Sequence, residues 1–324
     1  MAGFFVDISP LRRSRDFRWL FGGHAISRIG TQLTLVAAPI QVFELTGSTL
    51  AVGFLGLVQF PALFLGSMVG GLLADSLDRR RILLTAHVAF AAATAGLAIN
   101  AAVDAPLTWV VFVLTAINAF LAGIDSPARN AAIPRLVDAD ILPNAYAINV
   151  LVFQTAGAVG PAIAGLLISR VSLAAAYWVD TATFVVGLIA VFVMRPIPAP
   201  EDKAAAGLRS IVEGFRFIKS KQEIQGVYLI DINAMIFGLP RALFPEMGLS
   251  VFGGDASTVG YLFAAPGVGA MVASATSGWV GRITKPGRAT VAAVFLWGIG
   301  IMGFGLTTNL QLALILLALA GVGD

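Results

Sequence analysis

Apolar runs of about 20 residues recur from one end of the chain to the other, and they leave few folds open to it. We place these runs at residues 19–43, 50–74, 82–102, 107–126, 144–169, 173–194, 225–247, 257–281 and 289–307, with a tenth that begins at 311. A helix needs roughly 20 apolar residues to cross a hydrocarbon core, whereas a barrel strand needs about 9 to 11. Unpaired backbone groups cost several kcal/mol in lipid, so each run should be helical. The pattern predicts an all-α polytopic membrane protein with about nine and a half to ten spans.

The composition agrees with a membrane protein. Hydrophobic residues make up 58% of the chain and charged residues only 12%, and the mean hydropathy is +0.87. The chain has no cysteine, which excludes disulfides and thiolate chemistry. Four arginines precede the first run, which has full length and no small-residue cleavage pattern behind it. We therefore interpret it as a retained span and not as a removable signal.

The Lys and Arg residues gather on one side of the predicted spans. Eighteen of the 21 fall in the N-terminal segment, in alternate loops and in the segment 195–223, while the loops of the other side carry only Arg170 and Arg241. Positive charge marks the cytoplasmic side of short loops. The charge pattern thus predicts a cytoplasmic N-terminus and a cytoplasmic segment 195–223.

The chain also repeats itself after its sixth run. The segment 195–223 is too charged to enter lipid, and the loop GLLADSLDRRR (71–81) aligns with GWVGRITKPGR (278–288) in the second part. Two helical bundles joined by a linker suit a secondary transporter, because alternating access rocks one bundle against the other. The expected divisions are a cytoplasmic N-terminal segment (1–18), a six-helix bundle (19–194), a linker with an amphipathic helix (195–223) and a partial second bundle (224–324).

The loop GLLADSLDRRR is similar to the signature of the major facilitator superfamily, although Asp78 stands where many members have glycine. The same loop, with DSPARNAAIPRLV (125–137), GPAIAG (160–165) and LPRALFP (239–245), resembles the branch that contains bacterial enterobactin and macrolide exporters. The resemblance covers essentially the whole chain and implies two six-helix bundles. Residues 309–324 would rise only about 24 Å as a helix, so we expect a C-terminally truncated sequence.

The resemblance implies a gating role for the charged loop. Asp125 is expected to approach Asp75 and Arg79, and this charge cluster would hold the cytoplasmic side shut while the outside is open. The alternative is a solvated anchor that only fixes topology. Gly71 would permit close backbone approach at the end of the second span, or be an ordinary packing residue. The candidate gating residues are Gly71, Asp75, Asp78, Arg79, Arg80, Arg81, Asp125 and Arg129.

Charged residues inside the spans are candidates for substrate or proton binding, because they cost at least about 2.5–3.5 kcal/mol at a helix centre. Arg28 lies near the midplane and could pair with an anionic ligand or with an internal acid. Asp180 and Asp231 could carry a coupling proton or bridge helices. Polar residues that could line the cavity or bond neighbouring helices are Gln32, Gln59, Asn118 and Gln154.

The fifth run contains GAVGPAIAG (157–165), which is similar to a glycine-proline motif of exporters. Gly160 and Pro161 interrupt the helical hydrogen bonds, while Gly157 and Gly165 allow a tight helix crossing. The motif favours efflux; the alternative is a kinked packing helix.

We do not expect an enzyme, since His24 and His87 look isolated in the sequence and neither metal-ligand spacing nor a phosphate-binding loop occurs. We expect a secondary exporter of a small amphipathic molecule, drug- or siderophore-like, that uses alternating access and proton antiport and needs no cofactor. The alternative is a non-transporting membrane binding or sensor protein, or an inactive transporter fragment. The expected partners are the small-molecule substrate and membrane lipids, and not nucleic acid. The protein should be a multi-pass monomer of the bacterial inner or plasma membrane.

Overall fold

The computed structural model describes residues 7–197, 216–238, 240–276 and 286–323, and these residues contain helices and no strand. The first part comprises a short α1 (Ser9–Arg13) and six long helices: α2 (Arg15–Thr46), α3 (Thr49–Ser76), α4 (Arg79–Ala102), α5 (Thr108–Leu136), α6 (Leu142–Arg170) and α7 (Leu173–Val193). The second part comprises α9 (Gln222–Phe237), η1 (Pro240–Leu243), α10 (Phe244–Glu246), the π-helical η2 (Met247–Val251), α11 (Ala256–Ala275), α12 (Pro286–Leu306) and α13 (Leu310–Val322). We call α2–α7 the first half and α9–α13 the second half.

The long helices occupy the predicted apolar runs. Of the described helices, α3, α4, α5, α6, α7, α11 and α12 are long and apolar enough to cross a membrane, and α13 is a shorter apolar helix. Serine side chains fix three helix starts: Ser14, Ser48 and Ser172 accept hydrogen bonds from backbone N–H groups in the first turns of α2, α3 and α7. The segment 127–143, which separates the predicted runs 107–126 and 144–169, is mostly helical, because α5 continues through Pro127 and Pro134 to Leu136.

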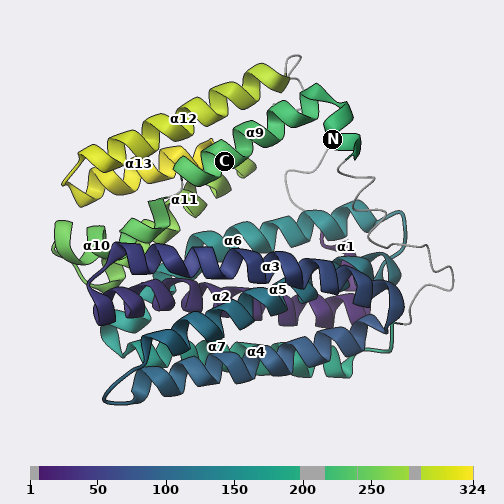
Figure 1. Cartoon of the computed structure of the whole chain (residues 1–324). Helices are drawn as coiled ribbons and strands as arrows, with labels where there is room; N and C mark the ends of the chain where they lie inside the picture. Colours follow the sequence, from purple (N-terminus) through teal and green to yellow (C-terminus); the bar gives the residue numbers. More distant parts are fainter. Residues whose placement is uncertain (1–6, 198–215, 239, 277–285, 324) are drawn as a thin grey trace.

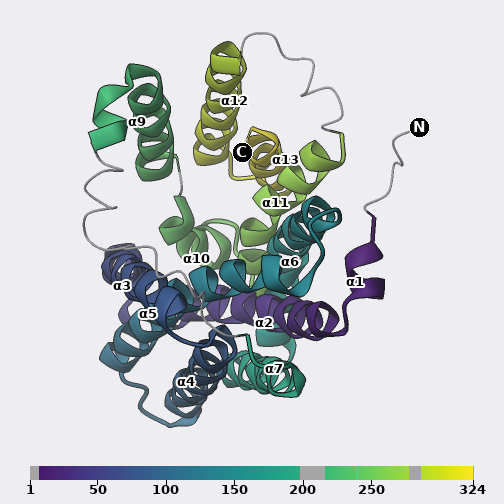
Figure 2. The ribbon, with the colours of Figure 1, turned by 90° about the vertical axis from the view of Figure 1, so that its right-hand side faces the viewer.

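Within the first half, α3 packs against α5, and α7 packs against both α2 and α4. The main contact between the halves is made by α6 with α11. Figure 2 shows the first half on one side and α9, α12 and α13 on the other, with α11 lying against α6.

The two ends of the molecule differ in how the halves meet. We call the end where α2 begins and α3 ends the basic end, and the end with α10 the opposite end. At the opposite end one apolar core joins both halves: Leu33, Val36 and Val52 pack in the same cluster as Phe244, Leu262 and Phe304. At the basic end the clusters of described residues around Leu83 and Phe17 contain no side chain of the second half. Figure 1 shows α9 and α12 diverging from α6 toward the end where α1 lies. The halves are thus joined at the opposite end and separate toward the basic end.

Candidate functional site

The contact between the halves depends on glycines of α6 and α11. A Cβ on Gly165 would lie 2.6 Å from the carbonyl oxygen of Ala256 and 2.9 Å from the Cα of Gly260. About two turns further along each helix, a Cβ on Gly267 would lie 2.6 Å from the carbonyl oxygen of Gly157. These distances leave no room for a side chain, so the two backbones cross in direct contact. Pro161 lies within the same continuous helix α6, and the carbonyl of Pro161 faces Gly260.

The predicted motif therefore acts in this structure mainly as a packing surface. Gly165 and the carbonyl groups of Gly157 and Pro161 face α11, whereas a Cβ on Gly157 or Gly160 would point toward the side chain of Gln32 on α2. The tight crossing expected at Gly157 and Gly165 is present, and it lies between the halves.

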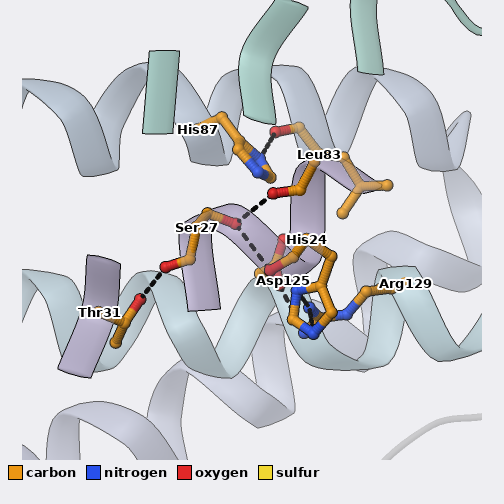
Figure 3. A network of polar contacts seen from close by, with 8 residues as sticks. His24, Ser27, Thr31, Leu83, His87, Asp125 and Arg129 are labelled. Atoms are coloured by element: carbon orange, nitrogen blue, oxygen red, sulfur yellow. Dashed lines mark hydrogen bonds and ion pairs between the residues drawn. The ribbon is translucent and has the colours of Figure 1, made fainter. Parts of the chain in front are cut away.

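A group of charged side chains lies between α2 and α5. Asp125 forms an ion pair of 2.7 Å with Arg129, one turn away on α5, and Arg129 contacts both ring nitrogens of His24 on α2. Figure 3 shows His24 and Arg129 pointing toward each other beside Asp125. The interpretation of His24 as isolated was wrong, because α2 and α5 bring residues about 100 positions apart into contact.

Arg28 lies one helical turn beyond His24, and no acid among the described residues forms an ion pair with it. Its guanidinium stacks on the ring of Phe153 of α6, with the Cζ atom 4.4 Å from the ring centroid. The Nε atom of Arg28 is buried and has no hydrogen-bond partner, and the same holds for both amide atoms of Asn118 and for Oδ1 of Asp125. Asp125 already pairs with Arg129, so the cluster holds two guanidinium charges against one carboxylate.

This cluster borders the space between the halves. Phe153 is 56% exposed, and its neighbour Gln154 donates a hydrogen bond of 3.3 Å to Ser274 Oγ of α11. Gln32, one turn beyond Arg28, lies against Gly160 of α6. The candidate cavity residues Arg28, Gln32, Asn118 and Gln154 lie on α2, α5 and α6, and of these helices α6 and α2 contact α11. Gln59 is half-buried on α3.

Asp180 lies apart from this group, inside the first half. Its carboxylate accepts hydrogen bonds from Thr34 Oγ1 at 2.5 Å and from Thr183 Oγ1 at 3.3 Å, and the residue is 1% exposed. A second buried bond joins the same two helices, from Tyr177 Oη to Gln41 Oε1 at 2.9 Å. Of the two roles considered for Asp180, this geometry matches the acid that bridges helices. The side chain of Asp231 lies outside the described residues.

The charged loop between α3 and α4 is tied to the end of α7. Asp78 caps α4 by accepting the N–H of Arg80 at 2.8 Å, and it also accepts the N–H of Ile197 at 3.3 Å. Arg80 donates to the carbonyl oxygens of Val191 at 3.2 Å and Phe192 at 2.6 Å, which lie at the C-terminus of α7. These contacts hold the first residues of the linker against the first half. The sequence carried a local signal for the Asp78 cap but none for its long-range partners.

The residues of the expected gating cluster lie on or beside α3, α4 and α5. Asp125 pairs with Arg129, while the charged groups near the buried Arg79 include Arg135, Asp75 and Asp78. Arg81 is exposed.

The close approach expected at Gly71 is not made there, because a Cβ on Gly71 would meet no atom within 4 Å. The preceding Gly70 makes it instead, with a Cβ position 2.6 Å from the Cα of Ile124. The matching loop 278–288 and the amphipathic helix of the linker lie largely outside the described residues.

Comparisons with known proteins match nearly the whole chain. The sequence profile of the family described as transmembrane secretion effector, of the major facilitator superfamily, matches residues 6–323. The chain is 29% identical over 316 residues to the enterobactin exporter EntS of Escherichia coli O1:K1 / APEC, which covers 98% of this chain and 76% of that protein. The enterobactin exporter EntS of Citrobacter koseri is equally similar.

Solved structures agree on the fold. A bacterial homologue of the human lysosomal transporter Spinster, inward-facing and unoccupied, aligns with a TM-score of 0.70 and 16% identity over 95% of this chain and 72% of that one. A bacterial homologue of the iron transporter ferroportin, inward-facing, aligns with a TM-score of 0.64 and 16% identity over 95% and 80% of the two chains. At this identity the likeness concerns the fold alone, which is that of the major facilitator transporters.

Proposed function

Because the chain belongs to the transmembrane secretion effector family of the major facilitator superfamily, whose members are transporters and not enzymes, we propose that it exports a small amphipathic molecule that carries an anionic group. The relatives described as enterobactin exporters make a siderophore-like molecule one candidate within this class.

The position of Arg28 is the observation that favours a substrate with an anionic group. A charged side chain deep in a membrane helix is costly and is kept where it has a partner or a function. The described residues give Arg28 an aromatic face but no carboxylate in an ion pair, and the one acid whose charge acts on Arg28 among them, Asp125, is engaged by Arg129. An anionic group of a substrate would supply the missing charge, with Phe153 offering a flat apolar contact beside it.

The transport cycle follows from the unequal ends of the molecule. The apolar core joins the halves at the opposite end, and the space between them widens toward the basic end. With the basic end on the cytoplasmic side of the bacterial inner membrane, as the positive charges favour, this is a state open to the cytoplasm. Export then requires the core at the opposite end to part while the basic ends meet, and proton entry supplies the energy. Asp75, Arg79 and Asp125 lie where the basic ends would meet.

Everted membrane vesicles test this function, because export appears in them as uptake. We would compare 1-anilinonaphthalene-8-sulfonate with N-phenyl-1-naphthylamine, which has the same ring system without the sulfonate, and include enterobactin as a third probe. Uptake of the anionic probe should depend on an imposed pH gradient. It should fall at least tenfold in Arg28→Gln and partly recover in Arg28→Lys, since a buried charge-assisted contact is worth about 1.5–3 kcal/mol.

Arg170→Gln is the matched control, since Arg170 is an exposed arginine at the opposite end of α6. It should transport like the unmodified protein. Preference for the neutral probe, or equal uptake by Arg28→Gln, would contradict the anionic substrate class. Gradient-independent binding without uptake of any probe would contradict transport.

A further inference from the structure

A groove on the outside of the first half is built from α2 and α7 and is separate from the site between the halves. It encloses about 570 Å³. Its lining is apolar along most of its length, and two arginines lie at its basic end. The residues that define it are Arg15, Arg18, Trp19, Gly22, Ile26 and Ile189.

The groove exists because of two adjacent glycines. A Cβ on Gly23 would lie 2.6 Å from the Cβ of Ala190, so α2 and α7 touch there and form the floor of the groove. A Cβ on Gly22 would meet no atom within 4 Å. The space above the floor is therefore open because Gly22 has no side chain.

The side chains beside this space face outward. Trp19 is 41% exposed, Ile26 44% and Ile189 55%. These residues belong to two long apolar helices, and α7 lies on the far side of α2 from the second half in Figure 2. Apolar side chains so exposed on a membrane protein face lipid, so the groove opens to the bilayer and not to the space between the halves.

The two arginines give the groove a charged end. Arg15 and Arg18 are exposed and lie one turn apart at the start of α2, and no ion pair joins either to a described acid. Asp16, which lies between them in sequence, lines a neighbouring polar pocket that Arg15 also borders, and not this groove. From residue 15 to residue 26 the helix rises roughly 16 Å, close to the thickness of one hydrocarbon leaflet.

We propose that this groove binds an anionic phospholipid, with its phosphate at Arg15 and Arg18 and one acyl chain lying over Gly22 between α2 and α7. The length, the apolar lining and the position of the charge match one lipid molecule of the leaflet at the basic end. Two guanidinium groups favour an anionic headgroup over a zwitterionic one, by about fivefold for each arginine near the surface.

Trp19 supplies a local probe for the test. A variant that keeps Trp19 and carries phenylalanine at Trp109, Trp178, Trp279 and Trp297 would be reconstituted into phosphatidylcholine vesicles. Small amounts of dibrominated phosphatidylglycerol or dibrominated phosphatidylcholine would then quench the Trp19 fluorescence. Half-maximal quenching should occur at a roughly 25-fold lower fraction of the glycerol lipid. In Arg15→Gln/Arg18→Gln the two lipids should quench alike.

Substitutions at glycine separate the groove from general lipid contact. Gly22→Leu should fill the groove and weaken quenching by the anionic lipid. Gly56→Leu on α3 is the matched control, since a Cβ on Gly56 also meets no atom within 4 Å but lies away from the groove, and it should change nothing. A variant that keeps only Trp178, which is 48% exposed elsewhere on α7, should show no headgroup preference.

Three results would overturn the proposal. Equal quenching of Trp19 by the two headgroups would leave only non-selective lipid contact. A preference that survives in Arg15→Gln/Arg18→Gln would place the lipid elsewhere. Quenching that falls as the protein-to-lipid ratio rises would assign the groove to a second copy of the chain.

Discussion

Cysteines at Gly53 and Ala242 should form a disulfide that joins the two halves at the opposite end. A Cβ on Gly53 of α3 would lie 4.0 Å from the Cβ of Ala242 in η1. Disulfides have Cβ–Cβ separations of about 3.5–4.5 Å, so the bond needs no movement of either backbone. The chain has no cysteine of its own, and any crosslink must come from the introduced pair.

The magnitude follows from the loop that the bond closes. About 190 residues separate the two positions, for which the loss of chain entropy in the unfolded state gives roughly 5 kcal/mol as an upper value and about 2–4 kcal/mol as the typical one. The oxidised form of Gly53→Cys/Ala242→Cys should thus unfold at a higher temperature than its reduced form. Export should stop on oxidation and return with a reductant, since the proposed transport cycle requires the halves to part at the opposite end.

In the assay, the protein is cleaved at a protease site introduced into the linker and its gel mobility is measured. Crosslinked halves migrate together until the disulfide is reduced. Gly56→Cys/Ala242→Cys is the control one turn along α3, and it should not crosslink because a Cβ on Gly56 has no neighbour within 4 Å. Failure of the first pair to crosslink would refute the joined core at the opposite end. Complete crosslinking with undiminished export would refute the parting of the ends.

Three further substitutions probe single contacts. Gly165→Ala should force α6 and α11 apart at a cost of about 1–3 kcal/mol, because the new Cβ would lie 2.6 Å from a backbone oxygen. The variant should also form the disulfide between positions 53 and 242 more slowly. Gly71→Ala, whose Cβ meets no atom within 4 Å, should leave the rate of disulfide formation unchanged. Asp255→Ala removes the N-cap of α11 and should destabilise the protein by about 0.5–2 kcal/mol. The side-chain hydrogen bond from Ser257 lowers the pKa of Asp255 below its usual value of 3.8. The ionised cap therefore stabilises the folded protein fully above pH 3.8, and this contribution is lost as the pH falls through the lowered pKa. The unfolding temperatures of the variant and the parent should converge over the same pH range. Arg80→Ala should lose about 1 kcal/mol and speed hydrogen exchange in the last turn of α7, where Arg80 bonds two carbonyls, whereas the exposed Arg81→Ala should leave exchange there unchanged.

The sequence predicts well what depends on a single helix. Hydropathy alone located the long helices, since each span must satisfy its own backbone in lipid. The depth of Arg28 follows from its distance along one helix, whereas the cap at Asp78 was not predicted, although aspartate is a preferred residue before a helix.

Features that depend on how helices rotate against one another could not be predicted. Gly70 and Gly71 are neighbours, yet only Gly70 faces α5, because a rotation of about 100° separates them. The contact of Arg129 with His24 was equally open until α2 and α5 were placed, whereas Asp125 and Arg129 pair across one turn of a single helix. The same applies to Arg80, whose acceptors lie more than 100 residues away.

The apolar core shared at the opposite end gives the molecule a temperature dependence of its own. When the halves part there, Phe244, Phe304 and their neighbours meet the water that fills the new opening, and not lipid. Hydration of apolar surface changes the heat capacity and makes such contacts weaker in the cold. The balance between the two orientations of the proposed cycle should therefore curve with temperature, and cooling alone should raise the share of molecules that are open at the opposite end.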